Sequence, residues 1–277
     1  MNVKEAVQEV RKKLAESTTD TPLLDAQLIV GKAAGMTRVQ ILTYPDKELN
    51  ENEICKINEM CSERIKHRPM QYILGVCEFM GLDFKVNSHT LIPRGDTEIL
   101  VERAIEIVKK NTYNSVLDIG TGSGAIAVSI AKYTNTHVDA VDISEGALKT
   151  AIENGSNNGV NVNFFISDLF SKVNEKYDII LSNPPYIEKD VIETLEPDVK
   201  DYEPLSALDG GNDGLDFYRR IINEIDSYLN KNGCVIFEIG YNQGDKVSKL
   251  LSERGFENIS VEKDLSGLDR VVIGYKI

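Results

Sequence analysis

Residues 116–124 read VLDIGTGSG, an apolar strand pattern that runs directly into a glycine-rich turn. The first four residues are typical of a strand that is buried on both faces of a parallel sheet. The apolar pattern from Ala125 to Ala131 then predicts a helix. Glycines at such a turn permit a tight bend and let a ligand approach the backbone closely. This strand–turn–helix unit predicts an α/β fold with a ligand against the turn.

The spacing of the glycines limits what that ligand is. A dinucleotide-binding fold usually has the spacing GxGxxG, and a Walker A loop ends in GK followed by Ser or Thr. Residues 120–124 instead have the spacing GxGxG, and no GK[ST] follows them. The turn therefore disfavours NAD as the ligand and excludes a Walker A loop.

Strand and helix patterns alternate through the rest of the chain. Further strands are expected at residues 138–142, 162–166, 177–182, 234–239, 259–261 and 271–275. Helices are expected between them at residues 145–154, 217–229 and 247–252. This alternation predicts a doubly wound, Rossmann-like α/β sheet of seven strands, with ligands at the carboxyl ends of the strands.

The chain before this sheet has a different character. Residues 1–70 carry helical apolar stripes that begin at capping residues such as Thr37 and either Asn50 or Asn52, which predicts a small helical bundle. Residues 71–93 contain two short strand patterns around Met80-Gly81, which predicts a linking β-hairpin. We therefore expect an N-terminal helical domain, then this linker, and an α/β domain at residues 94–277.

Two loops of the α/β domain contain candidate ligand contacts. Arg94 stands between a proline and a glycine and is a candidate contact, with an exposed loop arginine as the alternative. Asp96 or Thr97 is expected to cap the helix that follows. Residues 187–213 form a connection that is long for a compact domain and rich in Glu, Asp and Gly. Such connections are usually lids or binding loops.

The charge balance argues against a broad nucleic-acid surface. With 31 Lys and Arg against 44 Asp and Glu, the 277-residue chain has a formal net charge of −13, whereas surfaces that bind phosphates broadly are basic. The four cysteines form no CxxC pair, so we predict buried free thiols and no metal site. No apolar run approaches the roughly 20 residues that span a bilayer, and the N-terminus does not resemble a signal peptide. A cytoplasmic protein is expected.

Two aspartates end strands at the edge where ligands are expected. Asp142 ends the second strand, where a carboxylate can accept hydrogen bonds from both ribose hydroxyls of an adenosine ligand. Asp168 ends the third strand and can accept from an adenine amine, with Leu169 or Phe170 against the ring. A helix cap or a turn is the alternative role for each aspartate. Their strand-end positions favour the binding role.

Asn183-Pro184-Pro185-Tyr186 follows the fourth expected strand and suits a planar NH2 group. Prolines give no N–H to a strand ladder, have a fixed φ, and push the residue before them toward extended geometry. The side-chain carbonyl of Asn183 and the backbone carbonyl of Pro184 can therefore converge, with the ring of Tyr186 beside them. A turn that merely ends the strand is the alternative. The paired acceptors favour an amide or an exocyclic base amine as the ligand.

Together these residues resemble the class I S-adenosylmethionine-dependent methyltransferases. Asp118 with the glycine turn, Asp142 and Asp168 are similar to the cofactor site of that class. Residues 183–186 resemble the (D/N/S)PP(Y/F/W) motif of enzymes that methylate adenine N6, cytosine N4 or glutamine N5.

Over nearly its whole length the chain resembles the peptide chain release factor glutamine N5-methyltransferases. The resemblance rests on residues 68–75 (RPMQYILG), 92–94 (IPR), 96–98 (DTE), 203–208 (EPLSAL) and 269–270 (DR). That family usually has proline where Gly95 stands here. The difference leaves the loop around Arg94 less stiff.

The resemblance implies an enzyme of translation termination. It would transfer a methyl group from S-adenosylmethionine to the side-chain N5 of the glutamine in the Gly-Gly-Gln motif of release factors. Asn183 and Pro184 would be catalytic, because they would hold the amide and stabilise the charge that develops on its nitrogen. The substrate-binding residues would be Asn183, Pro184, Pro185 and Tyr186. The cofactor-binding residues would be Gly120, Thr121, Gly122, Ser123, Gly124, Asp142, Asp168, Leu169 and Asn183.

Other functions stay open on the residues alone. The motif at residues 183–186 cannot distinguish a release factor glutamine from a ribosomal protein glutamine or from N6 of adenine, although the charge of −13 weighs against DNA. A helical adaptor with a nucleotide-sensing domain would leave that motif without a role, and the glycine spacing disfavours an NAD-dependent oxidoreductase. We expect residues 1–70 to grip the protein substrate, and we expect a monomer without direct nucleic-acid or membrane contacts.

Overall fold

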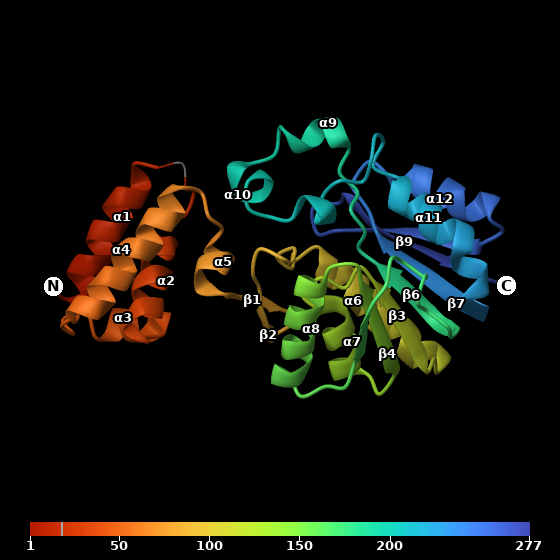
Figure 1. Cartoon of the computed structure of the whole chain (residues 1–277), viewed down its shortest axis with the longest axis horizontal. Coiled ribbons are helices and arrows are strands. Elements are labelled where there is room, and N and C mark those ends of the chain that lie inside the picture. The colour runs from red at the N-terminus through yellow and green to blue at the C-terminus, as the bar shows by residue number, and fades with distance from the viewer. Residues whose placement is uncertain (18) are drawn as a thin grey trace. The chain divides into compact units, whose positions relative to one another are not determined.

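The computed structural model describes residues 1–17 and 19–277, and the chain divides into two compact units. The helical unit contains Met1–Val76 and Glu196–Tyr202, and the α/β unit contains Cys77–Leu195 and Glu203–Ile277 (Figure 1). A short piece of the long connection after the fourth expected strand is therefore part of the helical unit. Within the described residues, no helix is both long and apolar enough to cross a membrane.

The helical unit forms because apolar side chains recur on one face of each of its longer helices. It contains α1 (Val3–Ala15), α2 (Pro22–Ala34), α3 (Arg38–Thr43), α4 (Glu51–Ile65) and α5 (Met70–Leu74). The buried stripe of α1 is Val3, Ala6, Val10 and Leu14, and α1 packs against α2 and α4. Asn2, Thr37 and Asn50 each form a capping box, which satisfies two otherwise free N–H groups at a helix start. The predicted helical bundle is confirmed.

Arg64 holds the segment of residues 196–202 within the helical unit. Its Nε lies 2.8 Å from Asp25 Oδ2, and its Nη1 lies 2.6 Å from Asp198 Oδ2. The Tyr202 hydroxyl also donates to the Lys66 carbonyl at 2.5 Å. The Arg64 and Asp25 side chains are only 11% and 4% exposed, so the pairing compensates charges that would be costly to bury alone.

The predicted hairpin is confirmed by β1 (Val76–Phe79) and β2 (Leu82–Lys85), which form a two-stranded sheet. Met80 and Gly81 connect them with φ of +53° and +70°. Two consecutive positive φ angles are typical of the tight turns that match the twist of a hairpin.

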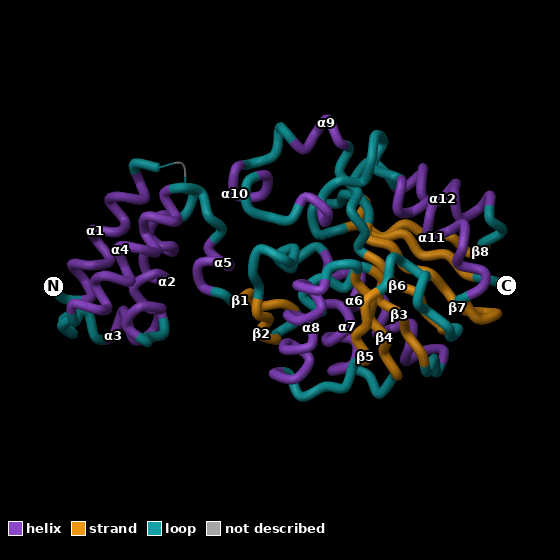
Figure 2. Tube along the Cα trace, viewed as in Figure 1, coloured by secondary structure: helices purple, strands orange, loops and turns teal. Residues whose placement is uncertain are grey.

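The α/β unit is built on one seven-stranded sheet (Figure 2). Its strands are β3 (Ser115–Ile119), β4 (His137–Asp142), β5 (Asn163–Ile166), β6 (Tyr177–Ser182), β7 (Leu229–Glu238), β8 (Glu257–Lys263) and β9 (Asp269–Tyr275). Their order is β5-β4-β3-β6-β7-β9-β8. The pairs from β5 to β7 are parallel, and β9 is antiparallel to both of its neighbours. The predicted doubly wound sheet is confirmed.

Helices cover both faces of this sheet, and each face has its own hydrophobic core. One face packs against α6 (Thr97–Asn111), α7 (Ala125–Tyr133) and α8 (Glu145–Asn157), and the other against α11 (Asp216–Glu224) and α12 (Gly244–Glu253). Side chains alternate between the two cores along the central strands, so that Val116 belongs to the first core and Leu117 to the second. The continuous apolar runs of the sequence follow from burial on both faces.

Some sequence expectations differ from the structure in detail. Leu229 was expected to end a helix but is the buried first residue of β7, because a 3-10 turn at Ile225–Ser227 ends the helix earlier. The connection at residues 187–213 contains α9 (Lys189–Ile192), α10 (Pro197–Lys200) and a 3-10 turn at Leu205–Ala207. Of the four cysteines, Cys61 and Cys234 are buried and Cys77 is partly buried, but Cys55 is exposed because it lies on the outer face of α4.

Candidate active site

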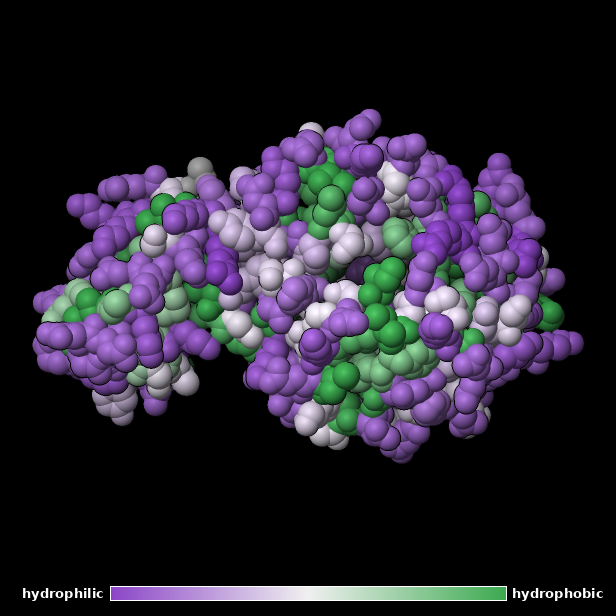
Figure 3. Space-filling view, in the orientation of Figure 1, coloured by the Kyte–Doolittle hydropathy of each residue, from purple (hydrophilic) through white to green (hydrophobic). Residues whose placement is uncertain are grey.

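A cavity of about 570 Å³ opens at the carboxyl ends of the central strands of the α/β unit. It is lined by residues that follow β3, β4, β5 and β6. The chain passes from β3 to β4 on one side, whereas β6 lies on the other side of β3, so the strand order reverses here. Ligands of open α/β sheets bind at such a reversal. Figure 3 shows a hollow on this face of the α/β unit, with hydrophobic side chains at its edge.

The glycine-rich turn of residues 120–124 connects β3 to α7. Gly122 and Gly124 have φ of +57° and +81°, in the left-handed region that favours glycine. A Cβ on Gly124 would lie 3.0 Å from the Cβ of Ala151, so this glycine also lets α7 pack against α8. The first four residues of the turn line the cavity, but Gly124 does not and is instead the N-cap of α7.

Asp142 lines the cavity at the end of β4, and the backbone anchors both of its oxygens. Oδ2 accepts from the N–H of Gly122 at 2.8 Å, and Oδ1 accepts from the N–H of Ser144 at 2.8 Å. Burial raises the pKa of Asp142, and these backbone hydrogen bonds oppose the shift. Each carboxylate oxygen can accept more than one hydrogen bond, so the anchored group can still accept from a ligand.

Asp168 and Leu169 line the cavity after β5. Asp168 Oδ1 lies 2.7 Å from Nη2 of Arg220, and both side chains are about half exposed, at 48% and 46%. The predicted contact of Asp168 with an adenine amine would share the carboxylate with this arginine, and it stays a prediction. Leu169 is buried with φ of +48°, a backbone conformation that positions its side chain at the cavity wall.

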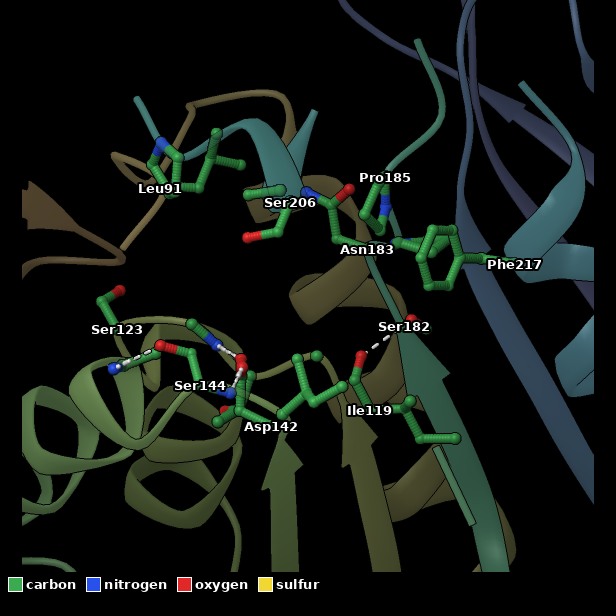
Figure 4. A pocket seen from close by; sticks show the side chains of 18 of the residues that line it. Leu91, Ile119, Ser123, Asp142, Ser144, Ser182, Asn183, Pro185, Ser206 and Phe217 are labelled. Atoms are coloured by element: carbon green, nitrogen blue, oxygen red, sulfur yellow. Dashed lines mark hydrogen bonds between the residues drawn. The ribbon is translucent and has the colours of Figure 1, made fainter. Parts of the chain in front are cut away.

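Asn183 stands at the point where β6 ends, next to β3. The Ser182 hydroxyl donates to the Ile119 carbonyl at 2.8 Å, which ties the ends of the two strands together. Asn183 Nδ2 donates to Thr97 Oγ1 at 3.3 Å, which leaves Oδ1 as the end of the amide available to a ligand. In Figure 4, Asn183 lies on one side of the cavity and Asp142 on the other. The structure therefore brings the two predicted groups of site residues to one cavity.

Pro184 and Pro185 also line this cavity, but Tyr186 does not. The Tyr186 hydroxyl donates to Glu238 Oε1 at 3.4 Å, and its ring packs against the core on the α11 side of the sheet. Burial raises the pKa of this tyrosine. Its ring was expected beside the paired acceptors, whereas the structure places it in the packing that supports the motif.

The comparisons with known proteins agree with this geometry. Residues 5–75 match the family described as PrmC N-terminal domain, and residues 86–196 match the family described as Methyltransferase small domain. The release factor glutamine methyltransferase of Clostridium acetobutylicum is 41% identical over 100% of this chain and 99% of its own length. That of Fusobacterium nucleatum is 45% identical over 95% of this chain and 76% of its own length. The chain belongs to the release factor glutamine methyltransferase family.

Solved structures are similar to this family member in fold. A methyltransferase from Pyrococcus furiosus has a TM-score of 0.53 and 22% identity, over 72% of this chain and 90% of that one. This likeness concerns the fold alone, while the family membership makes the chain an enzyme of the methyltransferase class. The resemblance noted in the sequence is confirmed.

Arg94 and Glu203 form an ion pair that the sequence did not foresee. Arg94 Nη2 contacts Glu203 Oε1, and the Glu203 side chain is only 1% exposed. Burial raises the pKa of Glu203, and the charge of Arg94 opposes that shift. Residues 204–207 follow this pair directly and line the cavity. Residues 204–207, near the end of the long connection, are thus held at the cavity by the pair of Arg94 and Glu203.

Further cavity residues of this methyltransferase were missed in the sequence, most of them because they give no local signal. Thr97 was expected as a possible cap, yet the N-cap is Asp96, neither side chain makes a capping hydrogen bond, and the Thr97 hydroxyl binds Asn183. Ile143 and Phe217 line the cavity as single apolar residues, which sequence periodicity cannot separate from core positions. Ser144 was missed as the N-cap of α8, although serine before a helix is a usable signal.

Asp118 braces the glycine turn from inside the sheet. It is fully buried, and its Oδ2 accepts from the Thr121 hydroxyl at 2.6 Å. Burial raises the pKa of Asp118 to about 7. Asp118 does not line the cavity. Its role is therefore to fix the shape of the glycine turn and not to contact a ligand.

Proposed function

We propose that this methyltransferase transfers the methyl group of S-adenosylmethionine to the side-chain N5 of the glutamine in the Gly-Gly-Gln motif of peptide chain release factors. The observation that carries the proposal is that Asn183 shares one cavity with Asp142 and the glycine turn. A methyl donor held by the turn and an amide held by Asn183 would then be neighbours. The names of the relatives, at 41–45% identity, support a release factor as the substrate.

The residues around the cavity fit S-adenosylmethionine. A Cβ on Gly120 or Gly122 would meet nothing within 4 Å, so the space beside the turn is open to a ligand. The anchored carboxylate of Asp142 suits ribose hydroxyls, and Ile143 and Phe217 offer apolar surface to an adenine ring. In this proposal the cofactor is held by Gly120, Thr121, Gly122, Ser123, Asp142, Asp168, Leu169 and Asn183, whereas Gly124, which was also expected to bind it, does not line the cavity. When bound, S-adenosylmethionine supplies an electrophilic methyl carbon, whose bond to sulfur breaks as the bond to nitrogen forms.

The role proposed for Asn183 and Pro184 follows from the chemistry of an amide. An amide nitrogen is a poor nucleophile because its lone pair is delocalised into the carbonyl. Asn183 Oδ1 and the Pro184 carbonyl would each accept one N–H of the glutamine side chain, and Pro185 would border the bound amide. These acceptors would orient the nitrogen and stabilise the positive charge that develops on it. One amide proton would then leave to solvent.

We also propose that different parts of the chain have different roles. Residues 1–70 would bind the body of the release factor, and residues 94–277 would carry out the methyl transfer. Residues 71–93 would connect these two domains. A side-chain amide is a small target, so contacts far from the cavity are needed to select one protein among many. The match of residues 5–75 to a separate N-terminal domain family is consistent with a dedicated role for this part.

The experiment that tests the function compares three acceptors. The full-length protein is incubated with methyl-labelled S-adenosylmethionine and with a release factor, a ribosomal protein or DNA. We expect label in the release factor alone, and no label when the glutamine of its Gly-Gly-Gln motif is replaced by glutamate. Label in the ribosomal protein or the DNA, with none in the release factor, would replace the proposed substrate.

A further inference from the structure

Gln243 is a buried glutamine that binds the backbone at the end of the Asn-Pro-Pro-Tyr motif of residues 183–186. It is the N-cap residue of α12, and only 3% of it is exposed. Its Nε2 donates to the Tyr186 carbonyl at 3.0 Å and to the Gly214 carbonyl at 3.2 Å. Its Oε1 accepts from the Gly240 N–H at 2.9 Å. The side chain thus joins three backbone segments of the α/β unit.

These hydrogen bonds fix the orientation of the Gln243 amide. Both hydrogens of its NH2 group are donated to carbonyls, and its oxygen faces an N–H. An amide turned by half a rotation would set its oxygen against two carbonyls and its NH2 group against a donor. Because a buried polar group is costly unless its hydrogen bonds are made, the site is specific for a glutamine in this one orientation.

Gln243 binds at a place where two distant parts of the chain are already paired. Residues 208–214 end the long connection and lie against the backbone that follows the motif. The Ile187 N–H donates to the Leu208 carbonyl at 3.0 Å, and the Gly210 N–H donates to the Ile187 carbonyl at 2.9 Å. We call residues 186–189 and 208–214 together the neck of the long connection.

Gly214 lets the two sides of the neck approach Gln243 closely. A Cβ on Gly214 would overlap the Tyr186 carbonyl oxygen and would lie 2.6 Å from Gln243 Nε2. Its φ of +71° is also in the region that favours glycine. The backbone on both sides is therefore shaped to receive the glutamine amide.

The motif depends on anchors of this kind because its two prolines have no N–H and cannot be held by donating a hydrogen bond. At the beginning of the motif, the Asn183 side chain is bound to Thr97. At its end, Gln243 binds the Tyr186 carbonyl. The Pro184 carbonyl stands between these two fixed points, so its direction depends on both.

We propose that Gln243 is a positioning residue that holds the end of the motif, so that the Pro184 carbonyl stays directed at the substrate amide. The inference rests on the proposed function, in which that carbonyl accepts an N–H of the glutamine. Without the two donated hydrogen bonds, the neck opens more often and the carbonyl loses its fixed direction. Since a displacement of about 1 Å at a reacting centre can lower the rate about 100-fold, Gln243 acts on the chemical step.

Cofactor binding should depend much less on Gln243. Phe217 lines the cavity from α11, which begins just after the neck. However, α11 has anchors of its own, because the buried Tyr218 packs in the core of this face and its hydroxyl donates to the Glu238 carbonyl at 2.7 Å. We therefore expect a loss of kcat without a matching loss of affinity for S-adenosylmethionine.

Two substitutions in the full-length enzyme test the inference. Gln243→Met removes all three hydrogen bonds at similar side-chain length, whereas Gln243→Glu keeps an acceptor for Gly240 and replaces the NH2 group by an oxygen. For release factor methylation we expect kcat to fall at least about 10-fold in both variants, with the Kd for S-adenosylmethionine within about threefold. Asn242→Met, at the exposed neighbouring position, is the matched control and should keep a normal kcat.

Two results of these measurements would overturn the inference. A normal kcat in Gln243→Glu would show that the hydrogen bonds donated to Tyr186 and Gly214 are not needed. A fall in kcat with an equal weakening of S-adenosylmethionine binding would show that Gln243 stabilises the α/β unit in general and does not position the motif.

Hydrogen exchange in the free enzyme separates this inference from the proposed function. The amide hydrogens of Ile187, Lys189 and Gly210 are hydrogen-bonded across the neck, so their exchange reports its opening. In Gln243→Met we expect them to exchange at least about 10-fold faster than in the wild type, with unchanged rates in β3. Unchanged exchange in the neck, or faster exchange with a normal kcat, would contradict the inference. Failure of the wild-type enzyme to methylate any glutamine would instead contradict the proposed function, whatever the exchange rates.

Discussion

Asn183 is the residue on which the proposed transfer depends most directly. Asn183 lines the cavity, and its hydrogen bond to Thr97 uses Nδ2. In the proposed function, the remaining Oδ1 would be one of two acceptors for the substrate amide. Loss of one preorganised hydrogen-bonding group in comparable sites costs about 3 kcal/mol, or roughly 100-fold or more in rate. We predict that Asn183→Ala lowers kcat for release factor methylation by at least about 100-fold and changes the Kd for S-adenosylmethionine by less than about threefold.

Single-turnover methylation and isothermal titration with S-adenosylmethionine measure the two quantities separately. Asn174→Ala is the matched control, because Asn174 is exposed in the loop before β6 and donates only to the nearby Lys172 carbonyl. An Asn183→Ala enzyme with normal turnover would remove Asn183 from the mechanism.

Asp142 should act on cofactor binding and much less on the chemical step. Both of its oxygens are anchored by backbone N–H groups, so in the proposed complex the carboxylate would already be in place to accept from the ribose hydroxyls. A hydrogen bond to a charged group contributes about 1.5–3 kcal/mol. We predict that Asp142→Asn weakens S-adenosylmethionine binding about 10- to 100-fold, with a smaller effect on kcat at saturating cofactor.

Calorimetric Kd values with S-adenosylmethionine check this prediction, and Asp46→Asn serves as the control because Asp46 is exposed in the helical unit. An unchanged Kd in Asp142→Asn would mean that the cofactor does not contact the end of β4.

At the scale of elements, the turn between β3 and α7 depends on the absence of a side chain at Gly124. Its φ of +81° is strained for other residues, and an added Cβ would lie 3.0 Å from the Cβ and 3.2 Å from the Cα of Ala151. The strain costs about 1 kcal/mol, and crowding in a packed contact costs about 1–3 kcal/mol more. We predict that Gly124→Ala destabilises the α/β unit by about 2–4 kcal/mol.

Gly159 offers the matched control for Gly124. Its φ is +66°, but a Cβ there would meet nothing within 4 Å, so Gly159→Ala should cost only the strain of about 1 kcal/mol. Hydrogen exchange of the β3 amides measures the opening free energy of the α/β unit without the helical unit. Equal losses in the two variants would show that the contact between α7 and α8 contributes nothing.

The helices and strands themselves were largely predictable, because they leave apolar patterns between residues that are close in the sequence. All seven strands of the sheet were expected, and so was the cap at Thr37. For α4 the sequence left Asn50 or Asn52 as the cap, and the structure has Asn50. The boundary at Leu229 was wrong, since its burial against Tyr177 comes from a neighbouring strand that is distant in the sequence. Likewise, no local pattern shows that residues 196–202 join the helical unit, which depends on Arg64 and Asp198.

At the scale of the whole molecule, substrate selection is proposed to depend on the helical unit. Val39 and Leu42 of α3 are 73% and 65% exposed, and Tyr44 just after α3 is 59% exposed. Single exposed apolar residues are ordinary, but several together on one short helix are typical of an interaction surface. We predict that the double substitution Val39→Asp and Leu42→Asp raises KM for the intact release factor by about 10-fold or more, with KM for a short Gly-Gly-Gln peptide unchanged.

Steady-state methylation of the two substrates provides the comparison. Leu265→Asp is the control, because Leu265 is fully exposed in the loop between β8 and β9 of the α/β unit. A similar rise of KM for the peptide and for the intact factor would show that α3 does not bind the body of the substrate.

Part of the cavity lining was also predictable from the sequence. The glycine turn, Asp142 and Asn183 carry signals in residue type and position, because each stands where an apolar strand pattern ends. Thr97, Glu203 and Glu238 carry no such signal, since a threonine near a helix start or a glutamate in a strand usually has a local or solvated role. Their partners are Asn183, Arg94 and Tyr186, each distant in the sequence.

The sequence alone determined that strands alternate with helices and which residue types stand at the strand ends, because periodicity and turn chemistry act between residues close in the chain. Only the tertiary structure decided that the glycine turn and Asn183 border one cavity, and that the Asn183 amide meets the Thr97 hydroxyl. The order of strands in the sheet creates these contacts, and that order depends on burial and pairing between segments far apart in the chain.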